Sequence, residues 1–220
     1  MRNSFIRYLF RPKLDNPVFV EGLPGFGNVG KNAADLFTKY LDGKLFAEYY
    51  SPFFPDYVHV GSNGICSPPH YEFYAPLSKE RLNAIVLTGD SQPQLDNVPA
   101  HYEICEEILD FAQKLDCELI VTIGGVPVSS ERKDVYVAAT TKKLAAEIMG
   151  KGGLIYGKGR IMGATGLLLG LAKRRGLKGF CLLGATAGLQ SDKEAGVAVF
   201  NLLLDFLRSR SKNQNEWEKG

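Results

Sequence analysis

The sequence has few of the residues that build metal centres. It contains four cysteines, none of them in a C-x-x-C pair, and three histidines, His59, His70 and His101. These spacings provide no zinc-ligand pattern, so we expect no metal site. Unpaired cysteines are typical of a reducing, cytoplasmic compartment, and the apolar neighbours of Cys105 and Cys181 predict buried thiols.

Long apolar runs and an excess of charge of one sign are also lacking. No stretch approaches the roughly 18 to 20 apolar residues of a membrane span, and segment 1–12 has no continuous apolar core of the kind a signal peptide needs. The 26 Lys and Arg residues nearly balance the 24 Asp and Glu residues, which leaves a formal net charge of +2. So small an excess does not predict nucleic-acid binding. We expect neither nucleic acid nor membrane as a partner.

What is present is the composition of an ordinary globular protein. The 220 residues are 45% hydrophobic and 23% charged, enough for one domain with a substantial core and no cross-links. We expect this single domain to span residues 1–210. The polar stretch 211–220 is expected to form a disordered tail.

Strand and helix patterns alternate along most of the chain. A short apolar strand after Pro17 leads into a glycine-rich turn and a helix, and a second strand follows at 44–50. Three further strand-like runs at 57–60, 70–74 and 82–88 have no helix between them, which predicts antiparallel strands beside parallel ones. Helices are expected at 98–115, 141–149, 163–175 and after Ser191 or Asp192, and strands at 118–123, 135–139 and 180–183. The pattern predicts a three-layer α/β/α domain with a mixed sheet.

The glycine-rich turn matches two nucleotide-binding patterns imperfectly. The spacing from Gly25 to Gly30 fits G-x-G-x-x-G, and Glu48 follows at a distance suited to a ribose contact. The strands downstream, however, lack the helical crossovers of a dinucleotide fold. Gly30-Lys31 also fits a phosphate-binding loop, but Asn32 replaces the hydroxyl residue that would hold magnesium. A third interpretation is structural, since glycines permit a sharp turn and close packing of the helix on the sheet.

The segment 88–93 follows the end of a strand, where open α/β sheets place ligand residues. Asp90 is a candidate general base or cation ligand, or it hydrogen-bonds the glycine turns together with Ser91 and Gln92. No Ser, Cys or Lys has a histidine base nearby in the pattern, so no catalytic residue is predicted. The candidate ligand-binding residues are therefore Gly25, Gly27, Asn28, Gly30, Lys31, Asp90, Gln92, Gly125 and Thr165.

Aromatic residues are dense between positions 49 and 74. Some of them must belong to the core, and the remainder would form an apolar outer patch of the kind found at protein interfaces. The group comprises Tyr49, Tyr50, Phe53, Phe54, Tyr57, Tyr71, Phe73 and Tyr74.

Taken together, several segments resemble the proteasome assembly chaperone family in its archaeal and bacterial single-domain form. The resemblance covers about residues 15–208, and its order and spacing are more specific than any one glycine motif. The matching segments are 21–30, 50–55, 87–93, 122–125, 163–172 and 181–185.

This resemblance implies a phosphorylase/hydrolase-like fold, a homo-oligomer, no cofactor and a non-enzymatic role in assembling proteasome α-subunits. Family members that dock on proteasomes end in a hydrophobic residue, a tyrosine and any last residue. The end of this sequence has no tyrosine, and Trp217 stands one place too early, so another protein complex is a possible partner. The alternative is a nucleotide-, nucleoside- or anion-binding enzyme of the same fold that uses loop 25–31 and Asp90.

Overall fold

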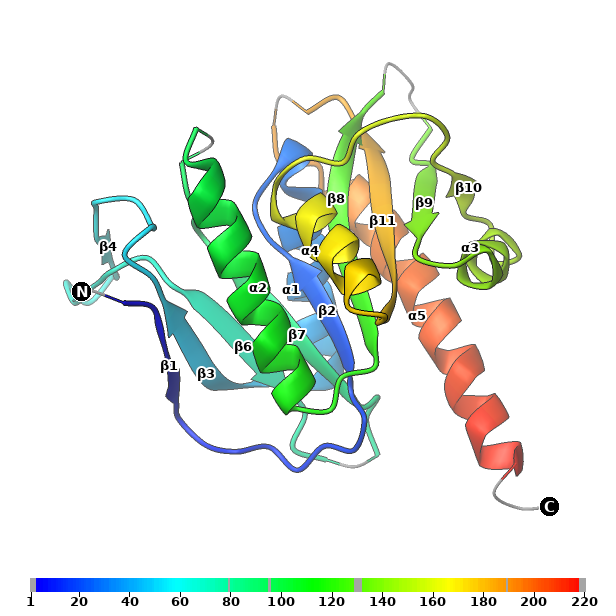
Figure 1. Ribbon diagram of the computed structural model, residues 1–220, viewed down its shortest axis with the longest axis horizontal. Coiled ribbons are helices and arrows are strands. Elements are labelled where there is room, and N and C mark those ends of the chain that lie inside the picture. The colour runs from blue at the N-terminus through cyan, green and yellow to red at the C-terminus, as the bar shows by residue number, and fades with distance from the viewer. Residues whose placement is uncertain (1–2, 79, 95, 129–131, 189, 218–220) are drawn as a thin grey trace.

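A central mixed sheet carries helices on both of its faces in the computed structural model (Figure 1). The structure describes residues 3–78, 80–94, 96–128, 132–188 and 190–217, with the backbone alone for 211–217. The strand order is β1-β3-β6-β7-β2-β8-β11-β9-β10, and β4 and β5 form a separate two-stranded sheet. The strands are β1 (Phe5–Tyr8), β2 (Val18–Gly22), β3 (Lys44–Tyr50), β4 (His59–Val60), β5 (Cys66–Ser67), β6 (Tyr71–Ala75), β7 (Ala84–Gly89), β8 (Leu119–Pro127), β9 (Val135–Ala139), β10 (Leu154–Ile155) and β11 (Lys178–Thr186).

The helices divide between the two faces of the sheet. Phe37, Ile148 and Leu203, from α1, α3 and α5, belong to one core cluster. Ile108 and Leu168, from α2 and α4, belong to another on the opposite face. The predicted three-layer α/β/α architecture is therefore confirmed. The helices are α1 (Val29–Leu41), α2 (Val98–Lys114), α3 (Lys142–Met149), α4 (Gly163–Arg174) and α5 (Lys193–Trp217).

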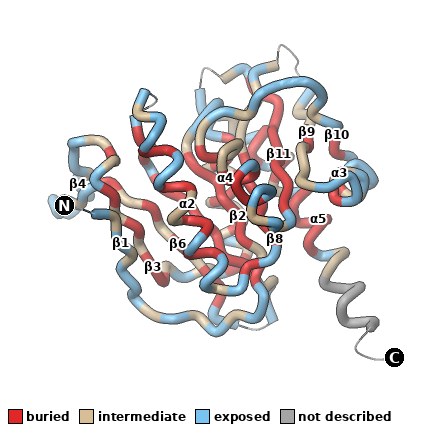
Figure 2. The backbone as a smooth tube through the Cα atoms, viewed as in Figure 1, coloured by how far each residue is buried: buried red, intermediate tan, exposed pale blue. Residues whose placement is uncertain are grey.

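Parallel strands occupy the middle of the sheet. Strand β2 pairs in parallel with β7 on one side and β8 on the other, and β8 continues in parallel to β11. These central strands are buried on both faces (Figure 2) and are accordingly almost continuously apolar. The strands β3, β6 and β7 form the antiparallel succession that the sequence predicts.

Three features of the sheet differ from the prediction, and one is the short strand β10, which pairs in parallel with β9 and has no counterpart among the predicted strands. The arginine-containing N-terminal segment forms β1, a strand that the sequence pattern does not predict, and it pairs antiparallel with β3. The expected strand at 57–60 does not join the main sheet. Only His59–Val60 is extended, and it pairs with Cys66–Ser67. The side chains of Val58 and Val60 are exposed, so the short two-stranded ribbon does not pack an apolar face against the main sheet.

The last helix runs further than the sequence pattern suggests. Helix α5 continues to Trp217, into the segment expected to be a polar tail, and the disorder expected for 211–220 stays a prediction, as does the single domain over 1–210. Within the part of the chain that the structure describes, no helix combines the length and the apolar character that crossing a membrane requires.

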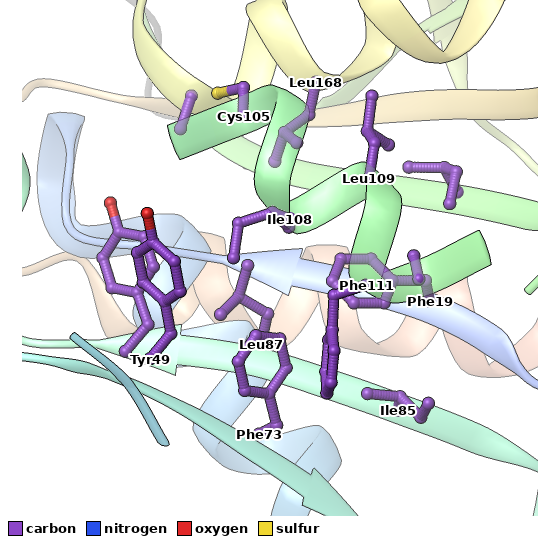
Figure 3. Close-up of a cluster of buried hydrophobic side chains, with 14 of the residues drawn as sticks. Phe19, Tyr49, Phe73, Ile85, Leu87, Cys105, Ile108, Leu109, Phe111 and Leu168 are labelled. Carbon is purple, nitrogen blue, oxygen red and sulfur yellow. The ribbon is translucent and has the colours of Figure 1, made fainter. Parts of the chain in front are cut away.

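Aromatic side chains fill the core beneath α2 (Figure 3). The ring of Phe111 lies 4.5 Å, centroid to centroid, from that of Phe73 on β6. Tyr49 and Tyr71 are also buried, whereas Tyr57 is exposed. Part of the aromatic group therefore belongs to the core as expected, but the expected outer patch of aromatic residues is not formed, because Tyr57 is the one exposed member of the group.

Candidate functional site

The glycine turn lies where the carboxyl ends of the central strands meet. Strand β2 ends at Gly22, a single 3-10 turn covers Phe26–Asn28, and α1 begins at Val29. Gly27 and Asn28 have φ angles of 59° and 49°. This left-handed conformation suits glycine and is tolerated by asparagine, so it explains the two residue types at the sharpest point of the turn.

Two glycines at this edge are required for close packing. A Cβ atom on Gly30 would lie 2.5 Å from the carbonyl oxygen of Ile123, and one on Gly125 would overlap the carbonyl oxygen of Phe26. Both contacts are with backbone, which cannot rotate away as a flexible side chain can. The turn and the start of α1 therefore rest directly on β8.

The backbone donors of the turn are partly engaged inside the protein. The Asn28 N–H donates to the Gly25 carbonyl at 2.9 Å, the Val29 N–H donates to the Phe26 carbonyl, and the Leu23 N–H donates to Glu21 Oε1 at 3.2 Å. These groups are not open to an anion in this conformation. Anion binding by loop 25–31 stays a prediction, and the packing interpretation has the stronger geometric support.

The structure brings together Lys31 and Asp90, two of the candidate ligand-binding residues. Lys31 Nζ lies 3.1 Å from Asp90 Oδ1 and 3.6 Å from Asp35 Oδ1. Burial lowers the pKa of Lys31, but the hydrogen bond with Asp90 and the charge of Asp35 outweigh it and leave the pKa raised. The ammonium is thus charged and already shared between two carboxylates. The pair links α1 to the end of β7.

Polar residues at the end of β7 and just after it hold the glycine turn in place. The Gln92 side-chain amide donates to the Pro24 carbonyl, and Thr88 Oγ1 donates to the Gly22 carbonyl at 3.0 Å. Gln92 therefore adopts the structural role that was the alternative to ligand binding.

A buried carboxyl group that the sequence analysis did not nominate lies beneath the turn. Glu21 is 0% exposed. Its Oε1 accepts from the Leu23 N–H and, at 3.4 Å, from Thr165 Oγ1, whereas Oε2 has no partner among the described residues. Burial raises the pKa of Glu21 to about 8, so the group is mostly protonated at neutral pH. In the sequence, the one indication of this buried group is that Glu21 is a charged residue type inside an apolar strand.

The groups around Glu21 are buried as well. Tyr71, Cys105 and Cys181 face it, and burial is the largest cause that raises the pKa of each. The predicted buried thiols at Cys105 and Cys181 are confirmed. Because thiolate is the reactive form, these cysteines are poor nucleophiles.

A cavity of about 370 Å³ opens beside the turn, between the end of β8 and the start of α4. Of the candidate ligand residues, the structure gathers Gly25, Gln92, Gly125 and Thr165 around it. The others, namely Gly27, Asn28, Gly30, Lys31 and Asp90, lie outside its lining. A second cavity of about 390 Å³ lies at the opposite edge, before β2 and β7, and includes both Asp15 and Arg81.

Among the described residues, the histidines form no hydrogen bond with a serine or cysteine side chain. His70 Nδ1 lies 2.9 Å from the Pro68 carbonyl and His101 Nε2 lies 3.2 Å from the Gln94 carbonyl. Ser91 Oγ instead bonds to Tyr57 at 2.6 Å. Within the described ranges, no group of three or more His, Cys, Asp or Glu side chains is placed to hold a metal ion.

Asp192 fastens the start of α5 to the glycine turn. Its N–H donates to the Gly27 carbonyl at 2.7 Å, and its Oδ1 accepts from the Ala195 N–H at 3.0 Å as a helix cap. Lys133 Nζ lies 2.7 Å from Oδ2. Burial opposes ionisation, but Lys133 and the Ala195 N–H outweigh it and lower the pKa of Asp192.

We expect Asp192→Ala to lower the free energy of unfolding by about 1 to 2 kcal/mol at neutral pH, the usual effect of losing a helix cap. Because the folded-state pKa is depressed, this stabilisation is present above the unfolded-state pKa and is lost as the pH falls. Urea unfolding at neutral and acidic pH measures both effects. Asp192→Asn, which keeps the cap and removes the charge, is the control. Equal stability of the alanine variant and the wild type at neutral pH would contradict the assignment.

The fold and the residues at the carboxyl edge of the sheet define the class of protein. It is a three-layer α/β/α domain with a mixed sheet, in which a glycine turn packs on that edge beside a largely apolar cavity. Residues 19–219 match the PAC2 family, and the chain belongs to that family. An uncharacterized protein of Methanocaldococcus jannaschii is 34% identical over 209 residues, which cover 94% of this chain and 79% of the relative.

Solved structures agree with the assignment. PbaB of Pyrococcus furiosus, described as an archaeal proteasome activator, is 34% identical, with a TM-score of 0.87 over 100% of this chain and 98% of its own. PbaA of the same organism, described as an archaeal homolog of proteasome-assembly chaperone, is 26% identical, with a TM-score of 0.76 over 97% and 90% of the two chains. The resemblance to proteasome assembly chaperones is therefore confirmed, and so is the fold class.

Proposed function

We propose that this chain is a chaperone-like protein that assists the assembly of proteasome α-subunits or of a related complex, as a homo-oligomer and without catalysing a reaction. The observation that carries the proposal is its similarity, over its full length, to PbaB, described as an archaeal proteasome activator. The chaperone-like role has the support of the family match and of PbaA. The identity of the client is the part that requires experiment.

The surface offers apolar groups for such contacts. Val60 and Ile65 on the β4–β5 ribbon are 66% and 68% exposed, and the ribbon lies apart from the main sheet at one end of the molecule (Figure 1). Exposed apolar patches are typical of protein interaction sites. We place the client contact on this ribbon.

The test is size-exclusion chromatography with light scattering on the purified chain, alone and with purified proteasome α-subunits. We expect a mass above that of the monomer, co-elution, and a changed yield of α-rings. Failure to co-elute together with an unchanged ring yield would contradict the function.

We expect Val60→Glu to weaken co-elution by about ten-fold or more, because it places a charge in an apolar contact. Leu77→Glu is the matched control, since Leu77 is also 66% exposed and lies before β7. Pull-down titration against the α-subunits measures both variants. Equal binding of the two variants would exclude the ribbon as the contact and leave the proposed function standing.

A further inference from the structure

The cavity beside the glycine turn has the walls of a small-molecule site. Leu23, Phe26, Val126 and Leu183 provide apolar surface from the turn, β8 and β11. None of the described residues that line it is acidic, and Arg160 is its basic residue. A mostly apolar cavity with a few convergent polar groups is the usual form of such sites.

Contacts with neighbouring residues hold the backbone of Arg160 in place. Its carbonyl accepts a hydrogen bond from Tyr156 Oη at 3.3 Å, and Gly159 packs so closely on Tyr156 that a Cβ there would lie 2.7 Å from the tyrosine oxygen. Ile161 rests against Gly166 on α4, where an added Cβ would overlap the Ile161 carbonyl. Segment 156–161 is thus held between Tyr156 and helix α4 at the rim of the cavity.

The charge of Arg160 at this rim is not neutralised by any carboxylate in the described part of the chain. No described carboxylate lies within ion-pair distance of the Arg160 guanidinium, whereas the guanidinium of Arg175 pairs with Glu106 and Asp110. The first turn of α4, at Gly163, Ala164 and Thr165, also lines the cavity, and its N-cap residue makes no side-chain cap. The amides of that turn add positive potential to the arginine.

We propose that this cavity binds a small organic carboxylate with an apolar body. The carboxylate would pair with Arg160 and the first turn of α4, and the apolar body would lie against Phe26 and Met162, which are 47% and 73% exposed at the rim. A phosphate dianion fits less well because Lys31 is outside the cavity and is shared by Asp35 and Asp90. A carboxylate carries the single charge that one guanidinium matches bidentately.

Isothermal titration calorimetry with 3-phenylpropionate tests the proposal, with 3-phenylpropanamide as the uncharged isostere. We expect saturable binding of the acid and binding at least about ten-fold weaker for the amide. Arg160→Gln should weaken binding of the acid about ten-fold or more, whereas Lys158→Gln, on the same segment but outside the cavity, should not. Absence of binding by the acid, equal binding of acid and amide, or equal effects of the two substitutions would overturn it.

A second pair of variants tests whether the acid binds in this cavity. Met162→Glu puts a carboxylate at the rim and should weaken binding of the acid about ten-fold. Met149→Glu, at an exposed methionine on α3 away from the cavity, should leave the dissociation constant unchanged. Equal affinities of the two variants would contradict the location.

Two probes distinguish the source of the carboxylate. An N-acetylated tripeptide ending in phenylalanine, as free acid and as amide, represents a protein C-terminus, and 3-phenylpropionate represents a free metabolite. Preference for the tripeptide acid over 3-phenylpropionate assigns a C-terminus, and the reverse preference assigns a small molecule. Displacement of 3-phenylpropionate by micromolar phosphate or AMP would overturn the assignment to carboxylates. These titrations need no α-subunit, so their outcome is independent of the proposed chaperone-like role.

Discussion

Raising the pH from about 5 to about 8 is expected to lower the free energy of unfolding by about 4 kcal/mol through Glu21 alone. Burial raises the pKa of this carboxyl group from 4.5 to about 8, so the folded protein retains a proton that the unfolded chain releases. The stabilisation from this proton is full below the unfolded-state pKa and is lost as the pH rises through the folded-state pKa. A difference of about 3.5 pKa units corresponds to about 5 kcal/mol in total, most of it lost by pH 8.

Denaturant unfolding across this pH range, on the wild type and on Glu21→Gln, measures the effect. The amide keeps the shape of the side chain and cannot ionise, so the variant should show a flatter dependence and exceed the wild type in stability at about pH 8. Glu118→Gln, an exposed position at the start of β8, should keep the wild-type slope. Parallel pH profiles for the wild type and Glu21→Gln would show that Glu21 is not the titrating group.

The groups that face Glu21 do not produce the same signal in this range. Tyr71, Cys105 and Cys181 have pKa values raised by burial. Their unfolded-state values of 10.0 and 9.0 lie above the window. Stopping at about pH 8 therefore separates the titration of Glu21 from that of these three groups, and the comparison with Glu21→Gln separates it from all others.

Replacing either of two glycines by alanine is expected to destabilise the fold by about 3 kcal/mol or more, at the upper end of overpacking effects. In Gly30→Ala the new methyl group meets the carbonyl oxygens of Ile123 and Leu23, and in Gly125→Ala it meets that of Phe26. All three oxygens belong to backbone that the sheet and the turn hold in place. Thermal and urea unfolding measure the loss.

Gly25→Ala is the matched control within the same motif. A Cβ there meets no atom within 4 Å, and its φ of −174° is extended backbone that any residue adopts. We expect a change within about 1 kcal/mol. Loss of stability at Gly25 equal to that at Gly30 would contradict the packing interpretation and return the motif to the ligand-binding one.

Much of the architecture follows from local patterns in the sequence. Apolar runs and helical spacing predict the central strands and all five helices, and the absence of helices between 57 and 88 predicts the antiparallel side of the sheet. The prediction fails at β1, at β10 and at the β4–β5 ribbon. All are short segments whose pairing depends on what lies beside them in space. Strand β1 pairs with β3, β10 pairs with β9, and, among the described residues, β4 pairs only with the short strand β5.

The candidate site was predicted less completely, for a related reason. Lys31 and Asp90 do meet, but each residue type is compatible with binding a ligand or with pairing inside the protein, and only the 3.1 Å contact decides between them. The sequence does not indicate Arg160 as a site residue, because a basic residue among glycines carries no local signal. Glu21 lies in a segment used for the family resemblance, and its one signal in the sequence is a charged residue type inside an apolar strand, which does not by itself indicate a retained proton.

The sequence by itself determined the order of the elements, the glycine turn after the first central strand and the membership of the family. These are properties of neighbouring residues, or of motifs in a fixed order, and both can be read along the chain. Tertiary structure alone decided how the turn is used. Packing against β8 gives Gly30 and Gly125 their steric role, burial gives Glu21 its proton, and the contacts of segment 156–161 place Arg160, which has no carboxylate partner among the described residues, in the lining of the cavity. Each depends on contacts between residues distant in sequence, and local patterns do not specify such contacts.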